Sequence, residues 1–144
     1  MLRFNIVIYS VLLFVLAGCA PSYTASDLDG TWVGHDYTIN SRGHSLTSKK
    51  VTLAVDANGL ITGSTAWTLL DGAGGNRGDA PVASDAEDII GVFDPDSGEF
   101  YLVEMDESGF WRGRMLSRDR LQAFLVQSGP KPVAATIELQ RAAD

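Results

Sequence analysis

Histidine and carboxylate side chains that lie close together are the first candidates for catalysis or metal binding. His35 and Asp36 are adjacent, and His44 follows a short distance along the chain. A zinc site needs three or four ligands at a recognisable spacing, and no third ligand accompanies this group. The sequence also contains no nucleophile-elbow motif. We therefore expect no catalytic residue, no metal site and no cofactor, in a protein that is not an enzyme.

Cys19 is the single cysteine of the chain, and its surroundings favour covalent modification. Met1–Asn5 carries the positive charge of Arg3, and Ile6–Leu16 is an almost unbroken apolar run. The run is shorter than the roughly 20 apolar residues that span a bilayer. A positive charge followed by a short apolar run is typical of a secretory signal. Small residues then lead directly to Cys19.

The order Leu16-Ala17-Gly18-Cys19 resembles the lipobox of bacterial lipoproteins. This resemblance implies that residues 1–18 are removed as a signal peptide and that Cys19 becomes the lipid-bearing first residue. A multiply acylated cysteine holds firmly to a membrane, whereas one acyl chain anchors only marginally. Ala20 stands where lipoproteins retained at the inner membrane of two-membrane bacteria have aspartate. The resemblance therefore implies an envelope protein anchored in the outer membrane and facing the periplasm.

Charge and length limit the remaining possibilities. The chain has 18 acidic residues against 11 lysines and arginines, and loss of Arg3 with the signal leaves a formal charge of −8. Nucleic acid as a partner needs a basic patch, so we expect none. Residues 19–28 are predicted to be a tether after the lipid. Residues 29–144 have a suitable length for one domain with a sizeable core.

Two tryptophans and a methionine are candidates for ligand binding. Trp111 shares one strand face with Gly113 and Met115, while Trp67 shares a face with Gly63. A glycine beside a tryptophan on an inward face leaves space that another side chain or a ligand must fill. Trp67, Trp111 and Met115 are therefore predicted to line a pocket for a small apolar ligand, with core packing as the competing interpretation.

A cluster of arginines interrupts the otherwise acidic second half of the domain. Cross-strand pairing on the surface is favoured over an anion site, because opposite charges on neighbouring strands are common there. The expected pairs join Arg112, Arg114, Arg118 and Arg120 to Glu99, Glu104, Asp106 and Glu107.

The elements that must position these residues are strands. Apolar and polar residues alternate with period two between turn residues, and helical periodicity is scarce. Asn58-Gly59 predicts a type I′ hairpin turn. The glycine-rich segment 71–85 predicts a long loop. Eight strands are expected, at Thr31–Ile39, Lys50–Asp56, Leu60–Leu69, Glu87–Asp94, Glu99–Met105, Phe110–Leu116, Leu121–Gln127 and Val133–Arg141.

An all-β meander of eight strands is expected to close into an up-and-down antiparallel barrel, because an open sheet leaves two exposed edges. The first strand begins Gly30-Thr31-Trp32, and Arg141 ends the apolar row of the last. This arrangement resembles the calycin group, the lipocalins and avidins. The resemblance implies that Trp32 closes one end of the barrel and that Arg141 stacks on it as a structural pair. The pattern of residues with which avidins hold biotin is not recognisable.

Two functions remain open at this point. One is a non-enzymatic binding module, whose barrel holds a small apolar ligand or a segment of an envelope protein. The other is an interaction or inhibitor protein that works through its loops and has a filled barrel. The interior of an eight-stranded barrel is just wide enough for either case, because it is filled by side chains or holds one small ligand. The volume of the interior distinguishes them.

Overall fold

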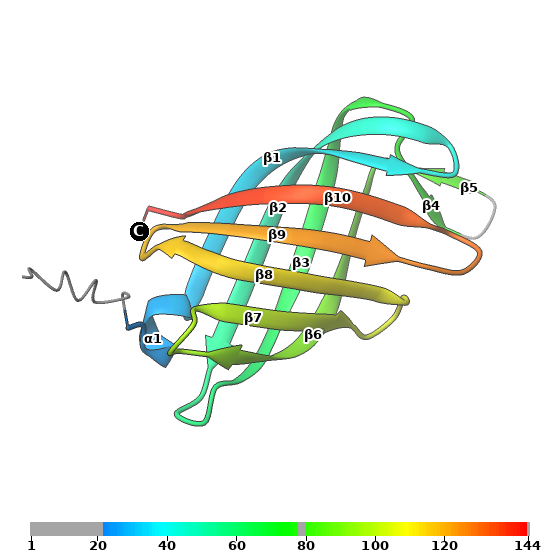
Figure 1. Cartoon of the computed structure of the whole chain (residues 1–144). Helices are drawn as coiled ribbons and strands as arrows, with labels where there is room; N and C mark the ends of the chain where they lie inside the picture. Colours follow the sequence, from blue (N-terminus) through cyan, green and yellow to red (C-terminus); the bar gives the residue numbers. More distant parts are fainter. Residues whose placement is uncertain (1–21, 78–79, 144) are drawn as a thin grey trace, which may run out of the picture.

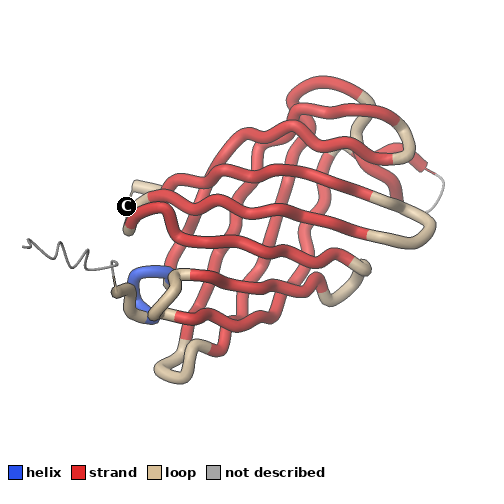
Figure 2. Tube along the Cα trace, viewed as in Figure 1, coloured by secondary structure: helices blue, strands red, loops and turns tan. Residues whose placement is uncertain are grey.

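The computed structural model describes residues 22–77 and 80–143 of the chain, so the predicted signal peptide and Cys19 lie outside the described residues. Strands make up most of the described part, with one short helix and several connecting loops (Figure 2). Within it, no helix has the length and hydropathy that crossing a bilayer requires.

The strands form one closed antiparallel barrel with the order β1-β10-β9-β8-β7-β6-β3-β2, and β4 and β5 form a separate two-stranded hairpin between β3 and β6. The predicted eight-stranded meander barrel is therefore confirmed. The elements are α1 (Ala25–Leu28), β1 (Gly30–Asn40), β2 (Gly43–Val55), β3 (Leu60–Gly72), β4 (Gly75–Arg77), β5 (Ala80–Val82), β6 (Ser84–Asp94), β7 (Glu99–Glu104), β8 (Gly109–Ser117), β9 (Arg120–Gln127) and β10 (Val133–Arg141).

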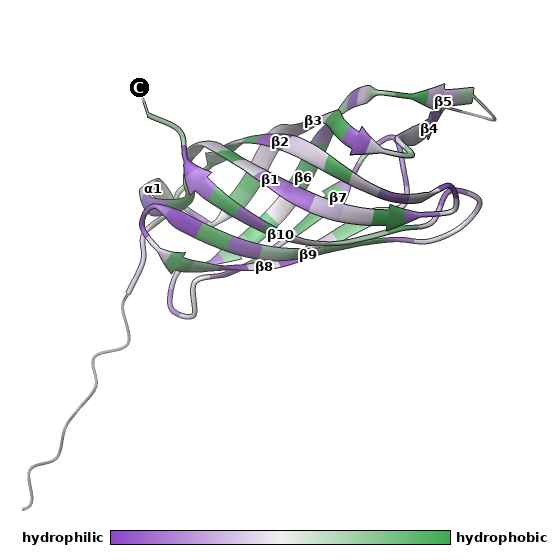
Figure 3. Cartoon of the chain, turned by 90° about the horizontal axis from the view of Figure 1, so that it is seen from above, coloured by the Kyte–Doolittle hydropathy of each residue, from purple (hydrophilic) through white to green (hydrophobic). Residues whose placement is uncertain are grey.

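The two ends of the barrel carry different elements. Helix α1 and the C-terminal end of the chain lie at one end, and the β4–β5 hairpin lies at the other (Figure 1). The view from above shows the same separation along the barrel (Figure 3). The strands run between these two ends, so each inward side chain lies at a definite depth, measured from the end that carries the β4–β5 hairpin.

The seam that closes the barrel lies between β1 and β10. Trp32 pairs with Arg141 at one end of the seam and Asn40 pairs with Val133 at the other. Between them, the carboxylate of Asp36 accepts a hydrogen bond from the backbone N–H of Glu138, with 2.9 Å between Oδ1 and N. A side chain thus satisfies a partly buried backbone donor within the seam.

Three local features differ from the sequence prediction. β2 begins at Gly43 instead of Lys50, because the inward residues of its first half are polar and give no apolar period. The predicted loop 71–85 contains the β4–β5 hairpin. The turn at Asn58-Gly59 is not type I′, because only Gly59 has a positive φ, of 77°. Instead, the carboxylate of Asp56 accepts hydrogen bonds from the backbone of Asn58 and Leu60, each at 2.8 Å.

The predicted tether also contains structure. Its described part forms the single turn of α1, and Leu28 at the end of this turn is fully buried in the core. The core begins at the end of the barrel nearest α1 and extends along the apolar inward rows as far as Trp111 and Leu125. It includes Leu28, Trp32, Val51, Leu53, Ile61, Phe93, Phe100, Met115, Leu121, Ile137 and Leu139.

Candidate functional site

The end of the barrel next to α1 is closed by Trp32 and Arg141. Trp32 is fully buried, and its indole N–H donates to the carbonyl of Leu28 at 2.9 Å. The guanidinium carbon of Arg141 lies 4.2 Å from the centroid of the Trp32 ring, well within cation–π range. This is the stacked pair that the calycin resemblance implies.

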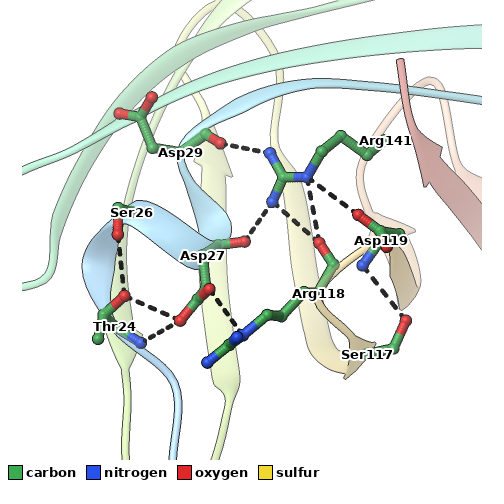
Figure 4. A network of polar contacts seen from close by, with 8 residues as sticks. All are labelled: Thr24, Ser26, Asp27, Asp29, Ser117, Arg118, Asp119 and Arg141. Carbon is green, nitrogen blue, oxygen red and sulfur yellow. Dashed lines mark hydrogen bonds and ion pairs between the residues drawn. The ribbon is translucent and has the colours of Figure 1, made fainter. Parts of the chain in front are cut away.

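Arg141 also ties three chain segments together at this end (Figure 4). Its Nη1 donates to the carbonyl of Asp29 at 2.8 Å, and its Nη2 donates to the carbonyls of Asp27 and Arg118. A guanidinium has five donors in a planar fork, so one side chain can satisfy several carbonyls at once. The contacts leave this end closed.

The opposite end of the barrel holds a cavity of about 450 Å³. Its lining includes the rim of the β4–β5 hairpin at Gly75 and the inward side chains of the strand ends farthest from α1. The volume falls in the range of sites that hold a small molecule. Side chains therefore leave space inside the barrel at this end.

Trp111 and Glu104 form the best-defined contact of the cavity. Trp111 is 2% exposed, and its indole N–H donates to Oε1 of Glu104, which is 6% exposed, at 2.9 Å. Glu104 lies over the backbone of Gly109, where an added Cβ would be 1.5 Å from Oε2. Burial raises the pKa of Glu104, because desolvation disfavours its charged form. The absence of a side chain at Gly109 leaves the space that the Glu104 carboxylate occupies.

Lys49 brings a positive charge to the same cavity. It is 6% exposed, and its Nζ donates to the hydroxyl of Thr47 at 2.6 Å. Burial lowers the pKa of Lys49 to about 8, although the negative charges of Asp36 and Glu104 act in the opposite direction. Asp36 lies deeper in the seam, where desolvation raises its pKa and its Oδ2 has no hydrogen-bond partner.

Further carboxylates lie at the rim of the cavity. Glu107 accepts hydrogen bonds from the side chains of Gln127 at 2.7 Å and Lys131 at 3.2 Å. Glu87 accepts one from the backbone N–H of Asp106 at 3.3 Å. Burial raises the pKa of Glu87 to about 7, and repulsion from Glu104 adds to this effect. The rim and the interior thus carry acidic groups that influence one another.

Trp67 lines the cavity near the hairpin. A Cβ added to Gly75 would lie 2.6 Å from the Trp67 ring, so the indole packs directly on the hairpin backbone. The hairpin is in turn held to the barrel rim by Asn40, which donates to the carbonyl of Gly74 at 2.8 Å, and by Ser45, which accepts from its N–H at 3.0 Å. These contacts fix the wall on which Trp67 rests.

The structure divides the three predicted ligand-binding residues. Trp67 and Trp111 both line the cavity, but Met115 does not. Met115 is buried on β8 two inward positions beyond Trp111, toward the closed end, where its backbone N–H donates to the carbonyl of Gly98. It belongs to the core because inward residues of one strand lie at different depths.

The prediction that Gly63 and Gly113 leave empty space beside the tryptophans was wrong. The room beside Gly113 is filled, since an added Cβ would lie 2.1 Å from the Phe100 ring. At Gly63 an added Cβ would lie 2.1 Å from the carbonyl oxygen of Thr52, so this glycine permits close approach of two strands. The cavity lies nearer the mouth, and its lining is more polar than the expected apolar pocket.

The expected charge pairs on the surface are only partly present. Arg112 pairs with Glu99 at 3.1 Å. Arg118 pairs with Asp27 at 3.0 Å and Arg120 with Glu138 at 3.4 Å, so the partners of these two arginines come from other strands and from α1. Arg114 contacts Gln122. Glu104 points to the interior because it shares the inward face of β7 with two apolar residues.

Glu104, Glu87 and Lys49 are the site residues that the sequence prediction missed. The signal for Lys49 was its period-two spacing from Val51 and Leu53, which placed a lysine in an inward row. Phe100 and Leu102 gave the corresponding signal for Glu104.

Among the described residues, no group of three or more histidines, cysteines, aspartates or glutamates is arranged to hold a metal ion. A scan against protein-family models found no match, and no curated protein matches the sequence significantly. The geometry of the cavity is therefore the basis for a functional interpretation.

Proposed function

We propose that this protein is a lipid-anchored envelope lipoprotein with a calycin-like barrel that binds a small molecule at its open end without transforming it. The observation that carries the proposal is the cavity of about 450 Å³ beside Trp67 and Trp111. One end of the barrel is sealed by the Trp32–Arg141 pair and the core, so the space is concentrated at the other end. A blind cavity of this kind suits a carrier or a sensor.

The ligand that suits this lining is polar or amphipathic. Thr47, Thr65 and Gln127 are each nine-tenths or more buried and line the cavity together with charged groups. An apolar ligand would displace water from this polar and charged lining without replacing the hydrogen bonds of that water, which costs free energy. The tryptophans provide the apolar surface that such a site also needs.

The proposed lipid anchor would orient the barrel relative to the membrane. Ser22, the first described residue, follows Cys19 by three positions, and three residues reach at most about 11 Å. Tyr23 donates its backbone N–H to the carbonyl of Pro95 at 3.1 Å, and α1 follows directly at the closed end. A lipid on Cys19 thus favours a closed end near the membrane and an open end that faces the periplasm.

The proposal is tested on mature lipoprotein extracted from its own membrane in a mild detergent. Native mass spectrometry should find a bound small molecule of constant mass. Val133→Trp, at the mouth of the cavity, should remove it, while Val103→Trp on the exposed outer wall of β7 should retain it.

Equal occupancy in both variants would place the ligand elsewhere and overturn the proposed site. A bound peptide in place of a small molecule would identify a protein segment as the occupant. The absence of any adduct, together with no saturable binding from a chemically diverse set of small molecules, would overturn the binding function.

A further inference from the structure

The cavity has more negative than positive groups in its lining. Glu87, Glu104, Asp106 and Glu107 contribute carboxylates. Lys49 and Lys131 are the basic side chains among the lining residues that the structure describes. The lining therefore carries a net negative charge when all of these groups are ionised, and the question is which carboxylates the two lysines already neutralise.

Lys131 already forms an ion pair with one of these carboxylates. Its Nζ lies 3.2 Å from Oε1 of Glu107, and Gln127 donates to the other oxygen of the same carboxylate. Lys49 has no carboxylate within 4 Å among the described residues and donates instead to Thr47. Its charge acts first on Asp36, which lies outside the cavity lining, and only then on Glu104.

Glu104 is the one buried carboxylate among the described residues that line the cavity. Its Oε1 accepts from Trp111, but its Oε2 accepts no hydrogen bond from any residue that the structure describes. The side chain is more than nine-tenths buried and lines the cavity. A carboxylate in such a weakly solvated position is stabilised by a nearby cation or hydrogen-bond donor.

Repulsion between the carboxylates also favours a positive charge at this site. The charge of Glu104 raises the pKa of Glu87, and the charge of Glu107 raises the pKa of both. A positive charge placed between Glu87 and Glu104 would be attracted to both and would remove this repulsion. Trp67 and Trp111 also line the cavity, and aromatic rings attract cations.

We propose that the ligand of this cavity is a small organic cation, an ammonium-bearing molecule whose charge meets Glu104 and Glu87 and whose remaining part lies against Trp111 and Trp67. The proposal rests on the proposed binding function and names the chemical class of its ligand. An organic cation suits the site better than a metal ion, because the described acidic residues form no metal-holding group.

The test compares the affinities of small ligands that share one carbon scaffold and differ in charge. The protein is the mature lipoprotein in a non-ionic detergent. Isothermal titration calorimetry uses 2-phenylethylamine, 2-phenylethanol and 3-phenylpropanoate, and a second series uses benzylamine, benzyl alcohol and phenylacetate. We expect each amine to bind at least tenfold more tightly than its neutral counterpart, and each carboxylate to bind most weakly. Spermidine serves as a cation without a ring.

Glu104→Gln should reduce amine affinity at least tenfold and leave the affinity for the alcohols unchanged, because glutamine keeps the acceptor for Trp111 and removes the charge. Glu87→Gln should have the same sign of effect. Asp88→Asn is the matched control, since Asp88 is exposed on the outer face of the same strand as Glu87. Thermal unfolding of each variant verifies that it folds.

Three outcomes would overturn the inference. These are preferential binding of the neutral or anionic compounds, equal amine affinity in Glu104→Gln and Asp88→Asn, and a neutral or anionic adduct in the native mass spectrum. Each of them leaves a binding function intact. The absence of every adduct and of all saturable binding would instead remove the binding function itself.

Discussion

Glu87 shows how the interior charges affect stability at the level of one residue. Its pKa is raised to about 7 from an ordinary value of 4.5, so the folded protein holds the proton over a pH range in which the unfolded chain has lost it. The stability gained from this proton is complete below about pH 4.5 and is lost as pH rises through 7.

Glu87→Gln should therefore increase the free energy of unfolding at pH 8 by on the order of 1–2 kcal/mol, less than the full shift implies because solvent screens this partly exposed group, and change it little at pH 5. Chemical denaturation across this pH range measures the effect. The exposed control Asp88→Asn should keep the pH dependence of the parent protein. An equal slope in Glu87→Gln and the parent would contradict the assignment of this proton to Glu87.

Gly113 is a second residue whose surroundings permit a quantitative prediction. An added Cβ would lie 2.1 Å from the ring of Phe100, which is 2% exposed and cannot move aside freely. Gly113→Ala should cost about 1–3 kcal/mol of unfolding free energy, the usual range for overpacking a core.

The same change made together with Phe100→Leu should cost clearly less, because leucine leaves room for the methyl group. A double-mutant cycle by denaturant unfolding measures this coupling. If the two changes were simply additive, the close contact between Gly113 and Phe100 would not be the cause.

At the scale of elements, α1 depends on the barrel for its existence. A four-residue helix is far too short to be stable alone. Leu28 buries its side chain in the core, and Arg141 holds the carbonyls of Asp27 and Asp29 from β10. The turn is thus held by residues that are distant in the sequence.

Arg141→Lys should loosen α1 although it keeps the charge, because an ammonium cannot span the same set of carbonyls. Amide hydrogen exchange of Asp27 and Asp29, whose N–H groups bond to Thr24 and Ala25, should become at least tenfold faster. Exchange in the middle of β3 should change little. Protection of α1 equal to that of the parent would show that Leu28 alone holds it.

The β2 and β7 strands show how inward rows change character along the barrel. In β2 the buried positions pass from Ser45, Thr47 and Lys49 to Val51 and Leu53. In β7 they pass from Phe100 and Leu102 to Glu104. The polar ends of both rows meet at the cavity, so the site is a property of strand ends and not of one motif.

At the scale of the whole molecule, the main expectation concerns the proposed anchor. Cys19→Ser should leave an unprocessed precursor that no longer fractionates with membrane lipoproteins, because serine offers no thiol for acylation. Mass spectrometry of the N-terminus of the parent and the variant is the measurement. An unmodified N-terminus at any residue other than Cys19 in the parent would contradict the lipoprotein interpretation.

The sequence by itself determined the eight strands, their order and the end at which Trp32 and Arg141 meet. Period-two alternation and turn residues are local signals, and a meander connects neighbours in chain order. Strands were predicted well where their inward residues are apolar. The first half of β2 was missed because its inward residues are polar.

Only the tertiary structure decided the depth of each inward side chain and where empty space remains. Gly113 is filled by Phe100 from the neighbouring strand, while Glu104 occupies the room over Gly109 and Met115 lies too deep to reach the cavity. These outcomes depend on the register between strands that are distant in the sequence and on closure of the barrel. Alternation along one strand carries no information about either, so the acidic cavity became visible only when the strands were placed together.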